Sequence, residues 1–190
     1  MIKYEDIRPE IKTGDVIAFS GDGITSSIIK LVTRSDISHV GLVLSKTEDG
    51  RIYIIESTSL LTTPDAITGE LHKGVQIQYL SDRIRDYDGE VYHVPLIKKI
   101  KNPNDMIAWL IQKHEEQIPY DSVQAIGSAL DIFIRLHNEE DFSSLFCSEL
   151  VTKALQLGGV VPKNINASEM HPEDVMQFKC LGPRSEELQL

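Results

Sequence analysis

Two β-rich runs separated by one short polar turn constrain the fold of this chain more than any other feature. Residues 37–45 and 51–58 are rich in Val, Ile, Leu and Thr, and the sequence Lys-Thr-Glu-Asp-Gly lies between them at 46–50. An Asp-Gly pair between two such runs is a strong local signal for a β-hairpin. The sequence therefore predicts an antiparallel hairpin over residues 37–58.

The register of this hairpin decides which side chains meet. If residues 46–49 form the loop, His39 stands opposite Glu56, and opposed side chains on one face lie about 5 Å apart at Cβ. A register longer by two residues would put Thr58 there instead, and a slip of one residue would turn Glu56 to the other face. The first register is the one that we expect.

The remaining pattern predicts strands in the first half of the chain and helices in the second half, which indicates an α+β fold. Asn102 suits an N-cap and Pro103 a first helical position, and Gly158-Gly159 would end a helix that begins at Cys147. The other expected elements are strands at 14–20, 75–80 and 90–97, helices at 25–33, 122–136 and within 172–178, a surface loop at 60–74 and a flexible acidic tail at 186–190.

Size and charge exclude several classes of protein. With 190 residues, 41% of them hydrophobic, the chain fits a single domain, 1–190, with a core over about 13–178. No apolar stretch approaches the roughly 20 residues that cross a bilayer, and residues 1–14 lack the apolar run of a secretory signal. We therefore expect a cytoplasmic protein. The formal net charge of −10 argues against a nucleic-acid partner, because phosphate binding needs a basic surface.

The chain has two cysteines, Cys147 and Cys180, without the spacing of a zinc or redox site and too few for a disulfide scaffold. Cys147 precedes an amphipathic helix, and the backbone amides at a helix N-terminus stabilise a thiolate and can hold an oxyanion. The sequence therefore predicts Cys147 as a nucleophile, with an ordinary buried cysteine as the alternative. Cys180 has no such context and is interpreted as structural.

Six histidines compete for the role of general base. His39 begins a core strand, where an imidazole among aliphatic residues needs a hydrogen-bond partner, and the hairpin offers Glu56. We predict His39 as the base and Glu56 as the acid that orients it, with a solvated strand-end acid as the alternative for Glu56. No histidines show metal-ligand spacing, so no metal and no cofactor are expected. The histidines interpreted as solvated helix ends, loop residues or an ordinary strand residue are His114, His137, His72, His171 and His93.

Several short motifs, taken in order, resemble a known family. They are Thr13-Gly-Asp-Val16, Ser38-His-Val-Gly-Leu-Val43, Ile54-Ile-Glu-Ser57, Gly74-Val-Gln76, Pro119-Tyr-Asp121 and Phe146-Cys-Ser-Glu-Leu150. Over roughly residues 13–178 the chain resembles the circularly permuted branch of the NlpC-type papain-like cysteine hydrolases, the YiiX-like group. The resemblance implies a papain-like core whose antiparallel, barrel-like sheet packs against the helix bearing the nucleophilic cysteine.

The resemblance maps nucleophile, base and orienting acid onto Cys147, His39 and Glu56. Tyr120 and Asp121 match a recurrent element of the group to which no chemical role is assigned. The implied activity is that of a cysteine peptidase or amidase, which cleaves an amide bond, as in cell-wall-type peptides, through an acyl-enzyme.

The active-site residues leave the activity open among three alternatives, because one nucleophile and one base serve both hydrolysis and acyl transfer. The first is a hydrolase of a small peptide, amide or ester, which the missing secretory signal favours over extracellular wall cleavage. The second is a thioester-forming acyltransferase or lipid hydrolase, which predicts an apolar, membrane-contacting loop near 60–67. The third is a non-catalytic binding module. The sequence indicates neither an oligomeric state nor whether 59–74 covers the cleft.

Overall fold

The computed structural model of the chain describes residues 1–21, 36–119 and 146–190. The helices expected at 25–33 and 122–136 lie outside the described residues, as do Tyr120, Asp121 and His137. In chain order the elements are β1 (Ile2–Lys3), α1 (Tyr4–Ile7), β2 (Val16–Gly21), β3 (His39–Lys46), β4 (Ile52–Thr58), β5 (Gly74–Tyr79), α3 (Leu80–Asp86), β6 (Gly89–Val94), α4 (Pro103–Glu115), α6 (Cys147–Leu157), the 3-10 helix η2 (Ala167–Glu169), α7 (Pro172–Met176) and β7 (Leu188–Gln189).

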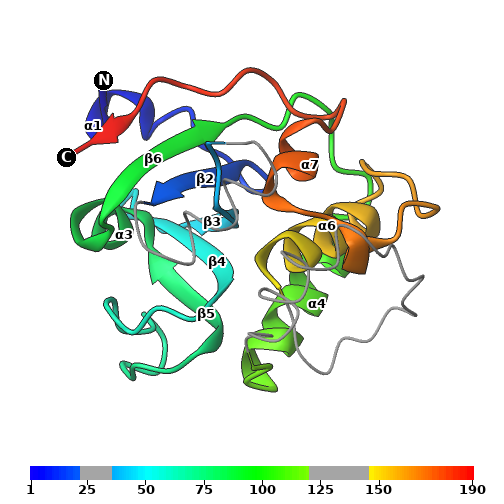
Figure 1. Ribbon diagram of the computed structural model, residues 1–190, viewed down its shortest axis with the longest axis horizontal. Coiled ribbons are helices and arrows are strands. Elements are labelled where there is room, and N and C mark those ends of the chain that lie inside the picture. The colour runs from blue at the N-terminus through cyan, green and yellow to red at the C-terminus, as the bar shows by residue number, and fades with distance from the viewer. Residues whose placement is uncertain (22–35, 120–145) are drawn as a thin grey trace.

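A five-stranded antiparallel sheet organises these elements (Figure 1). Its strand order is β5-β4-β3-β2-β6, so the hairpin β3–β4 lies inside the sheet and β5 and β6 form its edges. Helices α4 and α6 pack against one face, and α1 and α3 against the other. The α+β class is confirmed, and the described strands form an open sheet in which β5 and β6 do not pair with each other.

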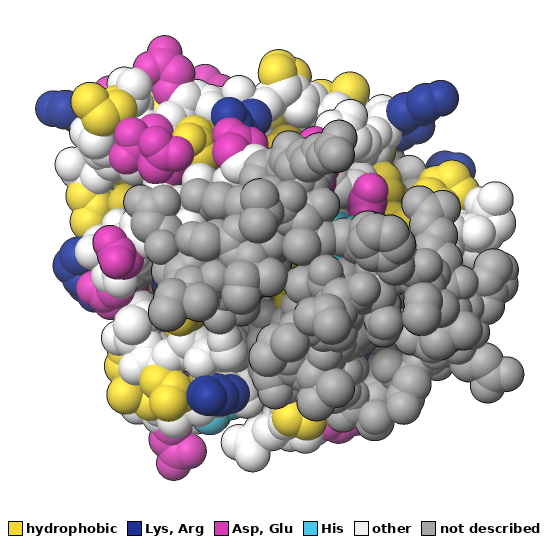
Figure 2. All heavy atoms as spheres, viewed as in Figure 1, with side chains coloured by type: hydrophobic (Ala, Val, Ile, Leu, Met, Phe, Trp, Pro, Cys, Tyr) yellow, Lys and Arg dark blue, Asp and Glu magenta, His cyan; other side chains and the backbone are white. Residues whose placement is uncertain are grey.

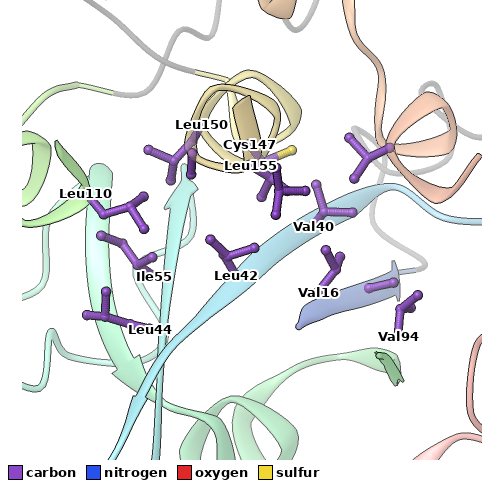
Figure 3. Packing of buried hydrophobic residues seen from close by; sticks show 14 of the residues in the cluster. Val16, Val40, Leu42, Leu44, Ile55, Val94, Leu110, Cys147, Leu150 and Leu155 are labelled. Carbon is purple, nitrogen blue, oxygen red and sulfur yellow. The ribbon is translucent and has the colours of Figure 1, made fainter. Parts of the chain in front are cut away.

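The alternation of side chains along β3 divides the interior into two hydrophobic clusters. Val40, Leu42 and Leu44 belong to the cluster under α4 and α6, whereas Val43 belongs with Phe19 to the cluster under α1 and α3. Figure 3 shows the first cluster from close by, with α6 lying over the side chains of β3 and β4. The helix that begins at Cys147 is therefore held on the sheet by apolar burial, the dominant favourable contribution to folding.

The predicted hairpin is confirmed, but its predicted register is wrong. Leu42 pairs with Ile55 and Lys46 with Ile52, and a β-bulge separates Val43 from Ser45. The turn lies further along the chain than the expected residues 46–49, because Lys46 is still in β3, the Thr47 N–H bonds to the Arg51 carbonyl, and Gly50 adopts a φ of 83° between them. Continued along the strand, this register places Gly41 across from Glu56 and Thr58 across from His39, which is the longer of the two registers considered above.

The C-terminal residues are ordered, which corrects the expectation of a flexible tail. Strand β7 pairs in parallel with β1, with Ile2 opposite Leu188 and Lys3 opposite Gln189. Figure 1 shows the two chain ends side by side. Leu188 is 3% exposed and belongs to the same cluster as Tyr4. A strand of two residues is too short to show a hydrophobic period, and the acidic residues before Leu188 indicate a flexible tail instead.

The described surface carries interspersed charges. On the face shown in Figure 2, the basic side chains outside the grey region are scattered among acidic ones and form no continuous patch. Within the described ranges, no helix combines the length and the apolar character needed to cross a membrane.

Leu188→Ala tests how much the β1–β7 pair contributes to stability. Truncating this buried side chain removes apolar contacts and leaves a cavity, so the free energy of unfolding should fall by about 2–4 kcal/mol in urea denaturation. Leu190→Ala is the matched control, because Leu190 is 59% exposed, and it should change stability by less than about 0.5 kcal/mol. Equal and small effects of the two substitutions would show that the docked terminus contributes nothing.

Candidate active site

Cys147 is the first residue of α6 and follows Phe146 at the N-cap position. The helix runs to Leu157, as the sequence predicts. Its first turn is closed by the Phe146 N–H, which donates to Glu149 Oε2 at 3.5 Å. Cys147 is completely buried, with 0% of its surface exposed. Any reaction at Cys147 therefore requires that the substrate reach a sulfur with no exposed surface.

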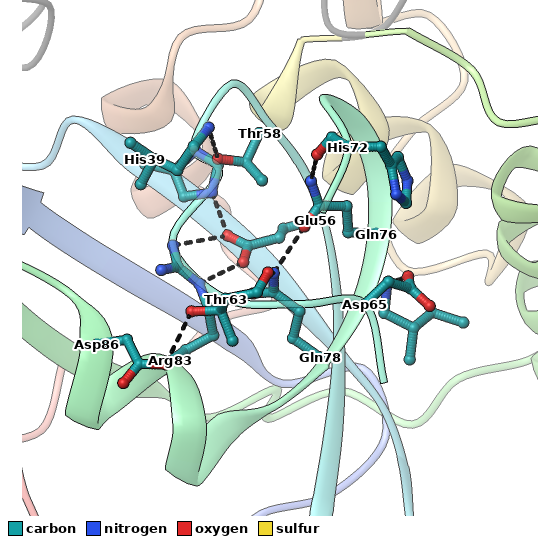
Figure 4. Close-up of polar contacts among 12 residues, drawn as sticks. His39, Glu56, Thr58, Thr63, Asp65, His72, Gln76, Gln78, Arg83 and Asp86 are labelled. Carbon is teal, nitrogen blue, oxygen red and sulfur yellow. Dashed lines mark hydrogen bonds and ion pairs between the residues drawn. The ribbon is translucent and has the colours of Figure 1, made fainter. Parts of the chain in front are cut away.

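His39 and Glu56 are joined by a hydrogen bond. His39 is the first residue of β3, and its Nε2 lies 2.5 Å from Glu56 Oε2 (Figure 4). An ionised carboxylate can only accept, so Nε2 carries the hydrogen and Nδ1 remains for a second partner. The predicted contact is therefore present, although the directly opposed register from which it was predicted is wrong.

Gly41 explains how Glu56 reaches His39 diagonally. The strand register places Gly41 across from Glu56, and a Cβ added at Gly41 would lie 3.3 Å from Glu56 Cβ. Since His39 and Gly41 are two residues apart on one strand, they share a face of the sheet. The missing side chain at Gly41 leaves room for the carboxylate to extend along that face.

Arg83 is a member of the site that sequence reasoning missed. Its Nε donates to Glu56 Oε1 at 2.5 Å, and its Nη2 donates to Oε2 at 3.4 Å. Arg83 is 1% exposed and comes from α3, a helix of seven residues. The only sequence signal is its spacing of three residues from the buried Leu80, and an arginine at such a position is ordinarily expected to reach solvent.

Opposing effects set the ionisation of Glu56 and His39. Burial raises the pKa of Glu56, but the charge of Arg83, together with the hydrogen bond and charge of His39, lowers this pKa to about 2. Burial lowers the pKa of His39, whereas the charge of Cys147, a hydrogen bond to Cys147 and the Glu56 carboxylate raise it to about 9. Glu56 is therefore ionised and His39 protonated across the neutral range.

A layer of buried amides lies beside the carboxylate (Figure 4). Gln76 of β5 is paired with Glu56 across the sheet and is 0% exposed. Gln78 Nε2 donates to Gln76 Oε1 at 2.6 Å and to the Thr63 carbonyl at 2.9 Å. These bonds tie the loop after β4 to the strand that pairs with β4 beside Glu56.

Two other histidines form buried pairs with aspartates. His114 Nε2 lies 2.8 Å from Asp65 Oδ2, and His93 Nε2 lies 2.7 Å from Asp15 Oδ2. The expectation that His114 is solvated at a helix end is therefore wrong. Asp65 also accepts three backbone N–H groups, from Ile67, Thr68 and Ile77. A carboxylate engaged in this way fixes its loop against α4, so we interpret the pair as structural.

A cavity of about 480 Å³ adjoins His114, lined mainly by apolar side chains that include Leu44, Tyr53 and Ile111. It lies at the turn end of the β3–β4 hairpin, whereas His39 and Glu56 lie toward the opposite end. None of its lining residues belongs to the site around Cys147.

Cys180 differs from Cys147 in its surroundings. It is 2% exposed, and burial raises the pKa of its thiol. Its carbonyl accepts the Ile97 N–H at 2.9 Å, which ties the chain after α7 to the end of β6. These features agree with the structural interpretation of Cys180.

Comparisons with known proteins place the fold but assign no activity. No family model matches the chain. An uncharacterized protein, R372, from Acanthamoeba polyphaga mimivirus is 28% identical over 161 residues, which cover 77% of this chain and 63% of that protein. The chain thus spans less than two thirds of the length of this relative.

A solved structure gives the clearer likeness. The crystal structure of the metalloprotein YiiX from Escherichia coli O157:H7, a DUF1105 protein, matches with a TM-score of 0.58 and 17% sequence identity. The match covers 93% of this chain and 97% of that one. The chain therefore has a YiiX-like fold.

YiiX is described as a metalloprotein, so the fit of the present residues to a metal matters. In the part of the chain that the structure describes, no group of three or more His, Cys, Asp or Glu side chains is placed to hold an ion. The oxygens of Glu56 are occupied by His39 and Arg83. The described residues do not fit a metal centre.

The ionisation of Glu56 should make stability depend on acid pH. Its pKa of about 2 lies below the ordinary value of 4.5. The stabilisation of the folded state by ionised Glu56 is therefore complete above about pH 4.5 and is lost as the pH falls towards 2. The difference in free energy of unfolding between the wild type and Glu56→Gln should narrow over that interval in a pH series of urea titrations.

Glu48→Gln, in the exposed turn between β3 and β4, is the control and should show no such trend. A difference between the wild type and Glu56→Gln that stays constant with pH would contradict an ionised Glu56.

Proposed function

We propose that this chain is a cysteine hydrolase that cleaves amide bonds, with Cys147 as nucleophile, His39 as general base and acid, and Glu56 as the orienting acid. The observation that supports it is the continuous chain of contacts from the sulfur through the imidazole to a buried, ionised carboxylate. A nucleophile, a base and a third group that orients the base are the parts that covalent acyl chemistry requires.

The resting state follows from the hydrogen bonds. His39 donates its Nε2 hydrogen to Glu56, which leaves Nδ1 for the sulfur of Cys147. Because the pKa of His39 is raised to about 9, the imidazole holds its second proton at neutral pH. In the proposed reaction Cys147 attacks as a thiolate beside this imidazolium, because the thiolate is the nucleophilic form of cysteine.

The reaction proceeds in two steps. The Cys147 sulfur attacks the carbonyl carbon, and the oxyanion that forms is held by backbone amides at the start of α6. The C–N bond then breaks as Nδ1 of His39 gives its proton to the leaving amine. Water next attacks the thioester and gives a proton back to Nδ1, and the C–S bond breaks to restore the thiolate.

The fitting substrate class is a small peptide, or an amide or ester of a small molecule. A second candidate, a lipid hydrolase or acyltransferase, is favoured by one observation on the loop between β4 and β5. Four of its large apolar side chains are exposed to 38–60%, namely Leu60, Leu61, Ile67 and Leu71. Co-sedimentation with phosphatidylcholine vesicles separates the two, because failure to bind would remove the lipid candidate.

Alkylation of Cys147 by iodoacetamide near pH 6 tests the thiolate–imidazolium pair. In the wild type, Cys147 should react faster than Cys180 by about tenfold or more, as measured by mass spectrometry of the labelled peptides. His39→Ala should slow the reaction of Cys147 by a similar factor, because the neighbouring positive charge is lost.

The matched control is His114→Ala, which removes a different buried histidine–carboxylate pair and should leave the alkylation rate unchanged. Equal, slow labelling of both cysteines in the wild type would reject the hydrolase and favour a binding module on the same fold.

A further inference from the structure

Arg83 binds the carboxylate that orients His39, yet no step of the proposed reaction uses it. Its guanidinium reaches both oxygens of Glu56, at 2.5 Å from Nε to Oε1 and 3.4 Å from Nη2 to Oε2. His39 occupies Oε2 of the same carboxylate at 2.5 Å. Glu56 therefore lies between two cations, one on each side.

The position of Arg83 is fixed by aromatic packing. The guanidinium carbon lies 5.0 Å from the ring centre of Phe19 and 5.1 Å from that of Tyr87. The Phe19 ring also lies 5.2 Å from the His39 ring. A guanidinium within about 6 Å of an aromatic ring centre is attracted to the ring face, and more strongly where water is excluded. The same ring thus packs against both partners of Glu56.

The two cations beside Glu56 differ, because His39 can lose its positive charge and Arg83 cannot. A carboxyl with no exposed surface tends to become neutral, and a neutral carboxyl can donate its hydrogen. His39 cannot secure the charge of Glu56 by itself, because the imidazole loses its proton during each reaction cycle. Arginine stays protonated at every accessible pH.

Among the described residues, the charged and titratable groups that act on Glu56 come from three elements. His39 faces it from β3 and Arg83 from α3, while Cys147 of α6 acts on it through His39. Its neighbour on β5 is Gln76, which is neutral. Arg83 is thus the permanent charge among these groups.

We propose that Arg83 is a positioning residue that keeps Glu56 ionised, and thereby keeps His39 in the tautomer whose Nδ1 faces Cys147. The effect on His39 and Cys147 rests on the proposed function, whereas the effect on Glu56 does not. Two measurements therefore test the two parts separately.

The first measurement is the titration of Glu56 by NMR of protein labelled with ¹³C at the glutamate carboxyl carbons, with Glu56→Gln identifying the signal. In the wild type, Glu56 should remain ionised down to about pH 3. Arg83→Met should raise the titration midpoint by at least about one pH unit, and Arg83→Lys, which keeps the charge, should raise it less. An unchanged midpoint in Arg83→Met would overturn the proposal.

The second measurement is the alkylation rate of Cys147 near pH 6 in the wild type, R83M, E56Q and the double variant R83M/E56Q. R83M should slow the reaction about tenfold in the wild-type background and less than about twofold in the E56Q background, because Arg83 acts through Glu56. Equal slowing in both backgrounds would show that Arg83 acts through packing alone, and would overturn its positioning role.

Folding of each variant is checked by thermal unfolding, since removing one partner of a buried ion pair costs about 3–5 kcal/mol. Arg83→Gln, neutral but able to donate a hydrogen bond, replaces R83M in both measurements if R83M does not fold. An unreactive Cys147 in the wild type would refute the proposed function, while the titration of Glu56 would still decide the role of Arg83.

Discussion

A carboxylate with no exposed surface, Glu56, is the constraint on which the candidate site depends. Removing such a group from water is expensive, and its charge persists only where cations and hydrogen-bond donors replace the lost hydration. Here Arg83 supplies a permanent charge and His39 a donor, so the pKa of Glu56 falls to about 2 despite burial. The helix α3, the aromatic rings beside Arg83 and the start of β3 are positioned so that both partners reach one carboxylate. Stability and the protonation state of His39 are therefore set by the same contacts.

The strand geometry explains why the site forms although its central pair is not directly opposed. The displaced turn and the bulge between Val43 and Ser45 together place Glu56 opposite Gly41. A side chain at that position would contact Glu56, whereas glycine leaves the face open toward His39. The two-residue displacement keeps Glu56 on the same face as His39, and the glycine provides the space for its carboxylate to reach His39. A displacement of one residue would have placed Glu56 on the opposite face.

Local sequence patterns predict the longer described elements, but not the short helices α1 and α3 or the long-range details. The hairpin, the edge strands and the helix from Cys147 to Leu157 have clear periods and end signals, so local patterns sufficed. The register was missed because a β-bulge leaves no local composition signal. Arg83 and the His114–Asp65 pair were missed because a charged residue is expected in solvent, and only the tertiary structure shows the partner that allows its burial. The docked C-terminal strand was missed because it is two residues long.

The protonation state of the candidate site belongs to the cluster of residues as a whole. In the proposed reaction, a thiolate at Cys147, an imidazolium at His39, a carboxylate at Glu56 and a guanidinium at Arg83 alternate in sign and sum to zero. A buried cluster of this kind tolerates ionisation because each charge faces an opposite one, whereas losing any member leaves an uncompensated charge in a dry environment. A YiiX-like fold by itself implies no function, because function belongs to particular side chains. Cysteine chemistry at this site therefore depends on four side chains, from β3, β4, α3 and α6, whose charges stabilise one another.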